Sequence, residues 1–190
     1  NGYAVAIFAN DSNFYAGSMS AEGAQKTTRF IKLCDTFNLP IVSLVDEPGF
    51  LIGPEAEKAG TILHGTNAVL ATTESTVPWT TIMIRKSFGV AAAAHYGPDG
   101  YVLAWPSAES GPLPLEGGVA VAFKKEIAQS DDPEAKRKEL EEKMAKNQSP
   151  FPRAEAFSVH EIIDPRETRK YVALWAERIQ SQLKASLMKR

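Results

Sequence analysis

The stretch from Val77 to Ala94 constrains the fold of this 190-residue chain most strongly. Pro78 opens it, and a run rich in Thr and Ile follows, as in a buried β-strand. Small residues with good helix propensity come directly after Gly89. The pattern predicts a strand, a tight turn at Gly89 and a helix. The free N–H groups of such a helix start, near Val90 and Ala91, would suit an oxyanion, although small residues packed closely against a sheet explain the same pattern.

Apolar strand-like runs alternate with helical patterns in the first half of the chain. Further strands are predicted at Tyr3–Ala9, Ile41–Val45 and Tyr101–Ala104. The second of these has almost no polar residue, as in a parallel strand covered on both faces. Helices are predicted from Ser20, as N-cap, to Phe37 and from Pro54 to about Thr73. The alternation predicts an α/β fold with a mainly parallel sheet surrounded by helices.

The second half is predicted to be mostly helical. The expected segments are a short apolar helix at Val119–Ile127, a charged helix from about Ser130 to Lys146, a turn or linker at Gln148–Pro152, and a last helix after Asp164. Asp164 is the expected N-cap of that helix, with Pro165 at its first position and Glu167 completing a capping box.

Composition excludes several classes of protein. A net charge of −2 offers no electrostatic reason to bind nucleic acid or an anionic membrane. The single cysteine, Cys34, rules out an internal disulfide framework and is predicted to lie in the core. No apolar run is long enough to span a bilayer and no signal peptide is evident, so a cytoplasmic location is the default expectation. The chain starts at Asn1 without a methionine, which suggests a piece of something longer.

Side chains suited to catalysis are scarce. The three histidines, at positions 64, 95 and 160, do not stand at metal-ligand spacing and are expected to be structural. A Ser87–His95–Asp99 triad can be drawn, but Ser87 lacks the Gly-x-Ser-x-Gly context, so no triad is predicted. Asp46 and Glu47 are adjacent in a Gly- and Pro-rich loop and need not converge as an acid–base pair. Main-chain donors remain, which suits a reaction that needs anion stabilisation and takes its base from elsewhere.

Short motifs in one consistent order carry a family resemblance. They are Ala16–Met19, Lys26 with Arg29–Ile31, Cys34–Pro40, Asp46–Phe50, Gly53, Gly60, His64–Gly65, Ala71, Glu74, Thr76–Pro78, Arg85–Gly89, Ala104–Glu109, Glu116–Gly117 and Ile163–Arg169. In this combination the chain resembles the C-terminal half of the carboxyltransferase (beta) subunit of biotin-dependent acyl-CoA carboxylases, the propionyl-CoA/acetyl-CoA type, within the crotonase superfamily.

The resemblance implies a crotonase/ClpP-like fold in which residues 1–190 form the carboxybiotin-side domain, with an N-terminal acyl-CoA-side domain outside this chain. The implied catalytic residues are Gly89, Val90 and Ala91. The implied cofactor-binding residues are Pro48, Gly49, Phe50, Phe88 and Ala92, and the implied substrate-binding residues are Glu47, Ala93 and Leu113. No metal is implied. The implied partners are a biotin carboxyl carrier domain, a biotin carboxylase subunit and further copies in a homo-oligomer, a hexamer in the family.

The implied reaction transfers CO2 from carboxybiotin to the α-carbon of an acyl-CoA through an enolate. The amides of Val90 and Ala91 would hold the biotin ureido oxygen, and the freed biotin nitrogen would take the α-proton, so that the protein supplies no base. The chain departs from the family pattern at Glu47, Leu63, Val90, Ala93 and Leu113-Pro114. These departures suggest a non-standard acyl group.

Two other classes remain open. One is another crotonase-superfamily enzyme, such as an acyl-CoA decarboxylase or hydratase, although a hydratase would need a carboxylate pair that the sequence does not reveal. The other is a non-catalytic assembly domain, which remains open because Val90 departs from the family pattern at an implied catalytic position. A second crotonase-like domain in the sequence before Asn1 would decide the architecture.

Overall fold

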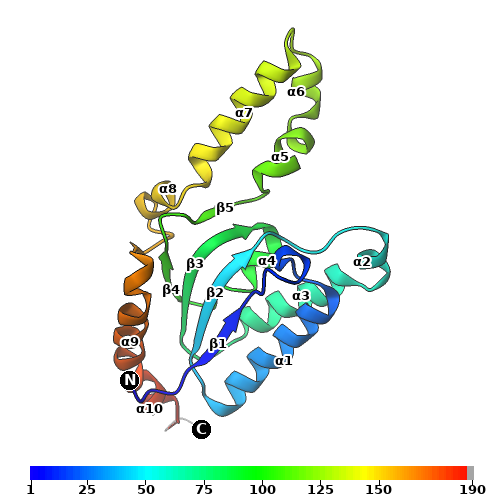
Figure 1. The fold of residues 1–190 in the computed structure, drawn as a ribbon. Helices are drawn as coiled ribbons and strands as arrows, with labels where there is room; N and C mark the ends of the chain where they lie inside the picture. Colours follow the sequence, from blue (N-terminus) through cyan, green and yellow to red (C-terminus); the bar gives the residue numbers. More distant parts are fainter. Residues whose placement is uncertain (188–190) are drawn as a thin grey trace.

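A six-stranded parallel sheet forms the centre of the molecule (Figure 1). The computed structural model describes residues 1–187, without the side chains of residues 116, 117 and 185–187. The strands are β1 (Ala6–Ala9), β2 (Ile41–Glu47), β3 (Trp79–Phe88), β4 (Tyr101–Ala104), β5 (Glu109–Gly111) and β6 (Glu161–Ile162). They run in the order β1-β2-β3-β4-β6, and β5 pairs with the second half of β3. The expected α/β architecture with a mainly parallel sheet is confirmed.

Helices connect the strands and continue beyond them. The α-helices are α1 (Ala21–Phe37), α2 (Pro54–Lys58), α3 (Thr61–Thr73), α4 (Gly89–Ala93), α5 (Leu115–Ala122), α6 (Lys124–Ala128), α7 (Pro133–Gln148), α8 (Pro150–Glu155), α9 (Thr168–Arg178) and α10 (Gln180–Leu187). Two 3-10 turns, η1 (Tyr15–Gly17) and η2 (Pro165–Glu167), complete the described elements.

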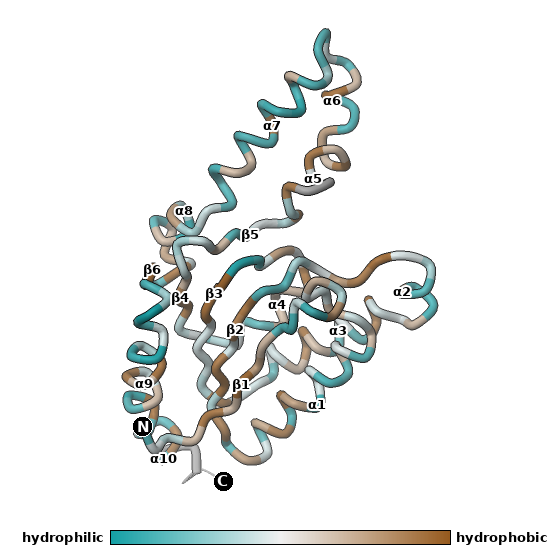
Figure 2. Tube along the Cα trace, in the orientation of Figure 1, coloured by the Kyte–Doolittle hydropathy of each residue, from teal (hydrophilic) through white to brown (hydrophobic). Residues whose placement is uncertain are grey.

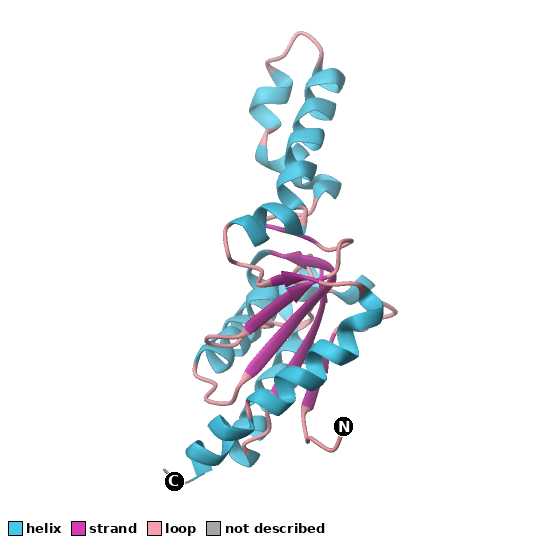
Figure 3. Cartoon of the chain, turned by 90° about the vertical axis from the view of Figure 1, so that its left-hand side faces the viewer, coloured by secondary structure: helices cyan, strands magenta, loops and turns pink. Residues whose placement is uncertain are grey.

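Both faces of the sheet are covered, which explains why its central strands are apolar without alternation (Figures 1 and 3). On one face Ile41 and Trp79 pack with Ile31 and Cys34 of α1. On the other face Val42, the next residue of β2, packs in a cluster with Trp175 and other residues of α9. Side chains of adjacent strand residues point to opposite faces, so burial of both requires a helix layer on each side.

The helices α5, α6 and α7 form an arm that extends away from the sheet (Figures 1 and 3). The hydropathy colouring shows brown stretches along the strands and a largely hydrophilic α7 (Figure 2). Leu140 is buried on α7, as expected, whereas most of that helix is exposed. Asp132 caps α7, since its Oδ1 accepts hydrogen bonds from the amides of Glu134 and Ala135 at 3.1 and 3.0 Å.

Several predicted boundaries are wrong. The helix expected from Pro54 to Thr73 is two helices, because Gly60 between them adopts a left-handed conformation with φ of 73°. The expected apolar helix at Val119–Ile127 is also divided, at Phe123. The predicted linker at Gln148–Pro152 contains the start of α8, because Ser149 caps a helix whose first residue is a proline. The first strand is shorter than predicted and begins at Ala6.

The last helix is only partly as predicted. Asp164 does act as a cap, accepting the amide of Arg166 at 2.9 Å, but the turn that it caps is η2. The Glu167 carboxylate does not complete the predicted capping box in the described residues. It accepts a hydrogen bond from Lys170 Nζ at 3.0 Å instead. Ile179 then separates α9 from α10. Among the described residues, no helix is long and apolar enough to cross a bilayer.

Cys34 is expected to be almost unreactive in the folded protein. It is completely buried on α1, as predicted, and burial raises the pKa of its thiol to about 11. The thiolate is the form of cysteine that reacts. At pH 8 the thiol reagent DTNB should therefore label less than about 1% of the folded protein in the time in which free cysteine reacts completely. Stoichiometric labelling should appear on adding guanidinium chloride. Rapid labelling of the native protein would contradict this burial.

Candidate active site at the carboxyl edge of the sheet

The candidate site lies where β2 and β3 end, because parallel strands present their carboxyl ends at one edge of the sheet. The prediction that Asp46 and Glu47 lie in a loop is wrong. The strand β2 continues to Glu47, which pairs with Ser87 of β3 after a register shift. The Asp46 carboxylate stabilises this irregular pairing, accepting the Lys86 amide at 3.1 Å and Arg85 Nε at 3.0 Å.

The turn at Gly89 begins α4 as predicted. Phe88, the last residue of β3, is extended, whereas Gly89 has φ of +64°, a left-handed conformation that favours glycine. Val90 and Ala91 follow in the first turn of α4, where an amide has no carbonyl four residues earlier in the helix. Val90 is 66% exposed and lies at the surface, whereas Ala91 is fully buried.

The loop after β2 brings Phe50 to the same region. A Cβ built on Gly65 of α3 would overlap the Phe50 ring, so the ring lies directly on the glycine of that helix. Phe50 also packs on the apolar cluster that contains Met19 and Ala91. Main-chain hydrogen bonds hold the loop: the Met19 amide donates to the Gly49 carbonyl at 3.1 Å, and the Leu51 amide donates to the Met19 carbonyl at 2.9 Å.

The other predicted site residues differ in how far they are exposed at the surface. Ala93 is exposed on α4, and Leu113, 39% exposed, follows β5. The segment before Leu113 does reach the turn, since a Cβ on Gly89 would lie 3.4 Å from the Pro112 carbonyl oxygen. The side chains of Phe88 and Ala92 are buried in the domain, at 1% and 4% exposure. Contact of these residues with a ligand stays a prediction.

Sequence reasoning missed a buried polar cluster behind the turn. It contains Glu47 and His95, both with 0% side-chain exposure, together with Ser43 and Asn10. A glutamate at the end of an apolar strand and a histidine inside an alanine-rich run were the available signals. Local pattern could not show that the two side chains meet. The rejected triad is indeed absent: Ser87 Oγ pairs with Tyr96 Oη at 2.7 Å, and His95 Nδ1 pairs with Ser43 Oγ at 3.0 Å.

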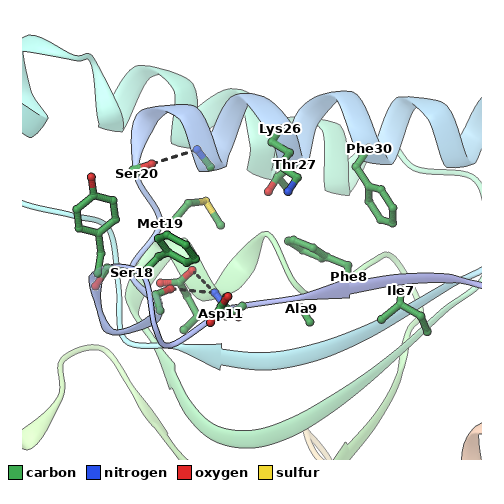
Figure 4. A pocket seen from close by; sticks show the side chains of 16 residues that line it. Ile7, Phe8, Ala9, Asp11, Ser18, Met19, Ser20, Lys26, Thr27 and Phe30 are labelled. Carbon is green, nitrogen blue, oxygen red and sulfur yellow. Dashed lines mark hydrogen bonds between the residues drawn. The ribbon is translucent and has the colours of Figure 1, made fainter.

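A cavity of about 430 Å³ lies beside this cluster, between β1, η1 and α1 (Figure 4). Its wall combines apolar side chains, including Phe8 and Phe30, with polar ones such as Lys26 and Thr27. Glu47 is the one predicted site residue on its lining. In the described part of the chain no group of three or more His, Cys, Asp or Glu residues is arranged to hold a metal ion.

The fold is that of carboxyltransferases. A solved transcarboxylase 12S structure, described as a hexamer assembly with methylmalonyl-coenzyme A and methylmalonic acid bound, superposes with a TM-score of 0.86 at 38% identity and covers 93% of this chain and 35% of that one. The carboxyltransferase domain has a crotonase-like fold, as expected.

The carboxyl transferase domain family matches residues 1–190, so the chain belongs to this family. The propionyl-CoA carboxylase carboxyltransferase subunit of Haloferax mediterranei is 40% identical over 174 residues, covering 89% of this chain and 34% of that relative. The methylmalonyl-CoA decarboxylase subunit alpha of Propionigenium modestum is 37% identical over 177 residues, covering 90% and 34%. The chain therefore spans about a third of the length of these relatives.

Proposed function

We propose that the chain forms the carboxybiotin side of a carboxyltransferase active site. The acyl-CoA side would come from a second crotonase-like domain. The observation that carries the proposal is the pair of first-turn amides at Val90 and Ala91, next to the apolar cluster on which Phe50 packs. Family membership supports the reaction class, and the position at the carboxyl edge of the sheet supports a ligand site there.

The residues present fit the ureido ring of biotin. The amides of Val90 and Ala91 would donate hydrogen bonds to its oxygen, and the positive end of the short helix would favour negative charge there. The Phe50 ring, fixed on Gly65, would offer an apolar surface to the ring system, and Gly49 would leave space beside it. Carboxybiotin, when bound, supplies both the carboxyl group and a basic nitrogen. The chain's own task is then to position the ring and stabilise its anion.

A second candidate is removal of a carboxyl group from an acyl-CoA. The relative named methylmalonyl-CoA decarboxylase subunit alpha favours it. The same amides would serve, because carboxyl transfer from acyl-CoA to biotin is the reverse of the first reaction and develops negative charge at the same ureido oxygen.

The proposed partners are a biotin carboxyl carrier domain, a biotin carboxylase subunit and further copies in a hexamer, and the proposed location is the cytoplasm.

The test uses the protein at the full length that its gene encodes, incubated with carboxylated biotin carrier protein and a series of acyl-CoA thioesters from acetyl to long and branched chains. Carboxylated thioesters are measured by mass spectrometry. We expect carboxylation that avidin abolishes, with the fastest turnover on a thioester other than acetyl- or propionyl-CoA.

The arms of this experiment separate the candidates. The transfer is reversible, so either candidate catalyses both directions and the rates separate them. Transfer from saturating methylmalonyl-CoA to uncarboxylated carrier that is faster than transfer from carboxylated carrier to any acyl-CoA would assign decarboxylation. Clear preference for acetyl- or propionyl-CoA would reject the non-standard acyl group and leave the reaction class intact. Turnover that avidin does not affect, or no reaction and no binding of the carrier, would overturn the proposal.

A further inference from the structure

The buried polar cluster joins the two walls of the candidate site. Glu47 Oε1 accepts the Gly49 amide at 3.0 Å, so the carboxylate holds the loop that carries Phe50. Its other oxygen, Oε2, accepts Asn10 Nδ2 at 3.0 Å and lies 3.8 Å from His95 Nε2. His95 lies in the turn that directly follows α4, and its amide donates to the carbonyl of Ala92 in that helix at 3.0 Å. The loop and the helix therefore meet through one carboxylate and one imidazole.

His95 is itself fixed from three sides. Its Nδ1 pairs with Ser43 Oγ on β2 at 3.0 Å, and its carbonyl accepts Thr81 Oγ1 on β3 at 2.8 Å. Its ring stacks on Phe8, with centroids 4.3 Å apart and planes 5° from parallel. Because His95 is bound to both β2 and β3, it fixes the end of α4 relative to the sheet.

Stability does not explain the arrangement. Burying a carboxylate is costly, and apolar side chains of similar size often replace a buried ionic pair without loss of stability. The pair is ionic only when His95 is protonated, and in the part of the chain that the structure describes His95 Nε2 has no hydrogen-bond partner. An unsatisfied buried nitrogen also opposes folding. Buried polar groups with such a cost are a feature of sites that need one specific geometry.

We propose that Glu47 and His95 are positioning residues that hold the Gly49–Phe50 loop and α4 in register with each other. Their effect is to present the Phe50 ring and the first-turn amides of α4 to the same ligand. The inference rests on the proposed function for the identity of that ligand. In this proposal Glu47 holds the loop from inside the domain. It does not make the contact with the substrate that the family resemblance implies.

The test compares Glu47→Gln, His95→Met and the double variant in the full-length protein with its biotin carrier. The Gln side chain keeps the shape of Glu47 but replaces an acceptor with a donor, so it opposes either Gly49 N–H or Asn10 Nδ2. The expected result is a 10- to 100-fold loss in kcat/KM for the carboxylated carrier, as is typical of a misplaced reacting group. The KM for acyl-CoA should stay within about twofold, because the other substrate is held elsewhere. Glu74→Gln, an exposed change at the end of α3, is the matched control and should behave as the parent protein.

Two readouts separate positioning from general destabilisation. The double variant should lose no more than the worse single variant, because the two residues act as one unit. Hydrogen exchange should quicken in residues 48–51 and 89–96 together and more than in the rest of the sheet, because the single variants break hydrogen bonds that hold these two segments. Multiplicative losses in the double variant, a matching loss for acyl-CoA, or exchange that quickens evenly over the whole domain would overturn the inference.

Hydrogen exchange also keeps this inference distinct from the proposed function. If the parent protein has no carboxyltransferase activity but the variants loosen both segments together, the positioning role stands and the assigned reaction falls. If the parent is active and neither segment responds, the reaction stands and the positioning role falls.

Discussion

Val90→Pro is expected to lower the carboxyltransfer rate about 100- to 1,000-fold while the protein stays folded, the loss typical of removing one oxyanion donor. Proline removes the amide hydrogen that we assign to the biotin oxygen. The first turn of a helix tolerates proline, since that amide has no acceptor within the helix. Gly89 before it has no Cβ to collide with the proline ring, which limits the usual restriction on a residue before proline.

The matched control is Val90→Ala, which keeps the amide and shortens the side chain of a residue that is 66% exposed. It should retain the parent rate within a few-fold. Single-turnover transfer from carboxylated carrier and thermal unfolding are measured on both variants. Parent-like transfer by a folded Val90→Pro variant would show that this amide does not hold the oxyanion.

Gly97→Ala is expected to cost the domain about 3 kcal/mol or more of unfolding free energy, or to prevent folding. A Cβ at position 97 would overlap Cγ, Cδ1 and Cδ2 of Trp79. These atoms lie at the base of the indole, next to the main chain of β3, so they have no flexible stem by which to move away. Trp79 is only 2% exposed, and its Nε1 donates to Ser75 Oγ at 3.0 Å, which fixes the ring further.

Gly23→Ala on α1 is the control. A Cβ there would meet Ser20 Oγ and Met19 Cγ at 3.5 and 3.7 Å, which is ordinary contact, so this variant should gain up to about 1 kcal/mol from helix propensity. Denaturant unfolding measures both. Combining Gly97→Ala with Trp79→Ala should cost less than the sum of the two single changes, because the second removes the atoms that the first would strike. A stability for Gly97→Ala within about 0.5 kcal/mol of the parent would contradict the close contact.

Local signals predicted elements well where one residue type decides the backbone. Ser20 caps α1, with its Oγ accepting the Gly23 amide at 3.1 Å, and Gly89 makes the turn into α4 in the conformation that glycine favours. The apolar run at Ile41 predicted a strand covered on both faces, and the structure confirms this.

Local signals failed where one residue type allows two outcomes. Glycine is tolerated inside a helix and also ends one, and at Gly60 the chain takes the left-handed conformation that separates α2 from α3. A Pro-rich stretch indicates a turn, yet a proline after Ser149 equally begins a helix, as in α8. The Gly- and Pro-rich stretch that begins at Asp46 predicts a loop, yet Glu47 continues β2, because its buried carboxylate finds partners in Asn10 and Gly49 outside the strand.

The amino-acid sequence by itself determined the α/β class, the family and the stretch where main-chain donors follow a glycine turn. The fold class and this stretch depend on residue periodicity and on conformational preferences that act over a few neighbouring positions, whereas the family depends on short motifs that follow one consistent order. Tertiary structure alone decided that the Phe50 ring lies on Gly65, that Trp79 leaves no space at Gly97 and that Glu47 meets His95. Such contacts arise when the sheet aligns segments far apart in the chain, so no local pattern encodes them.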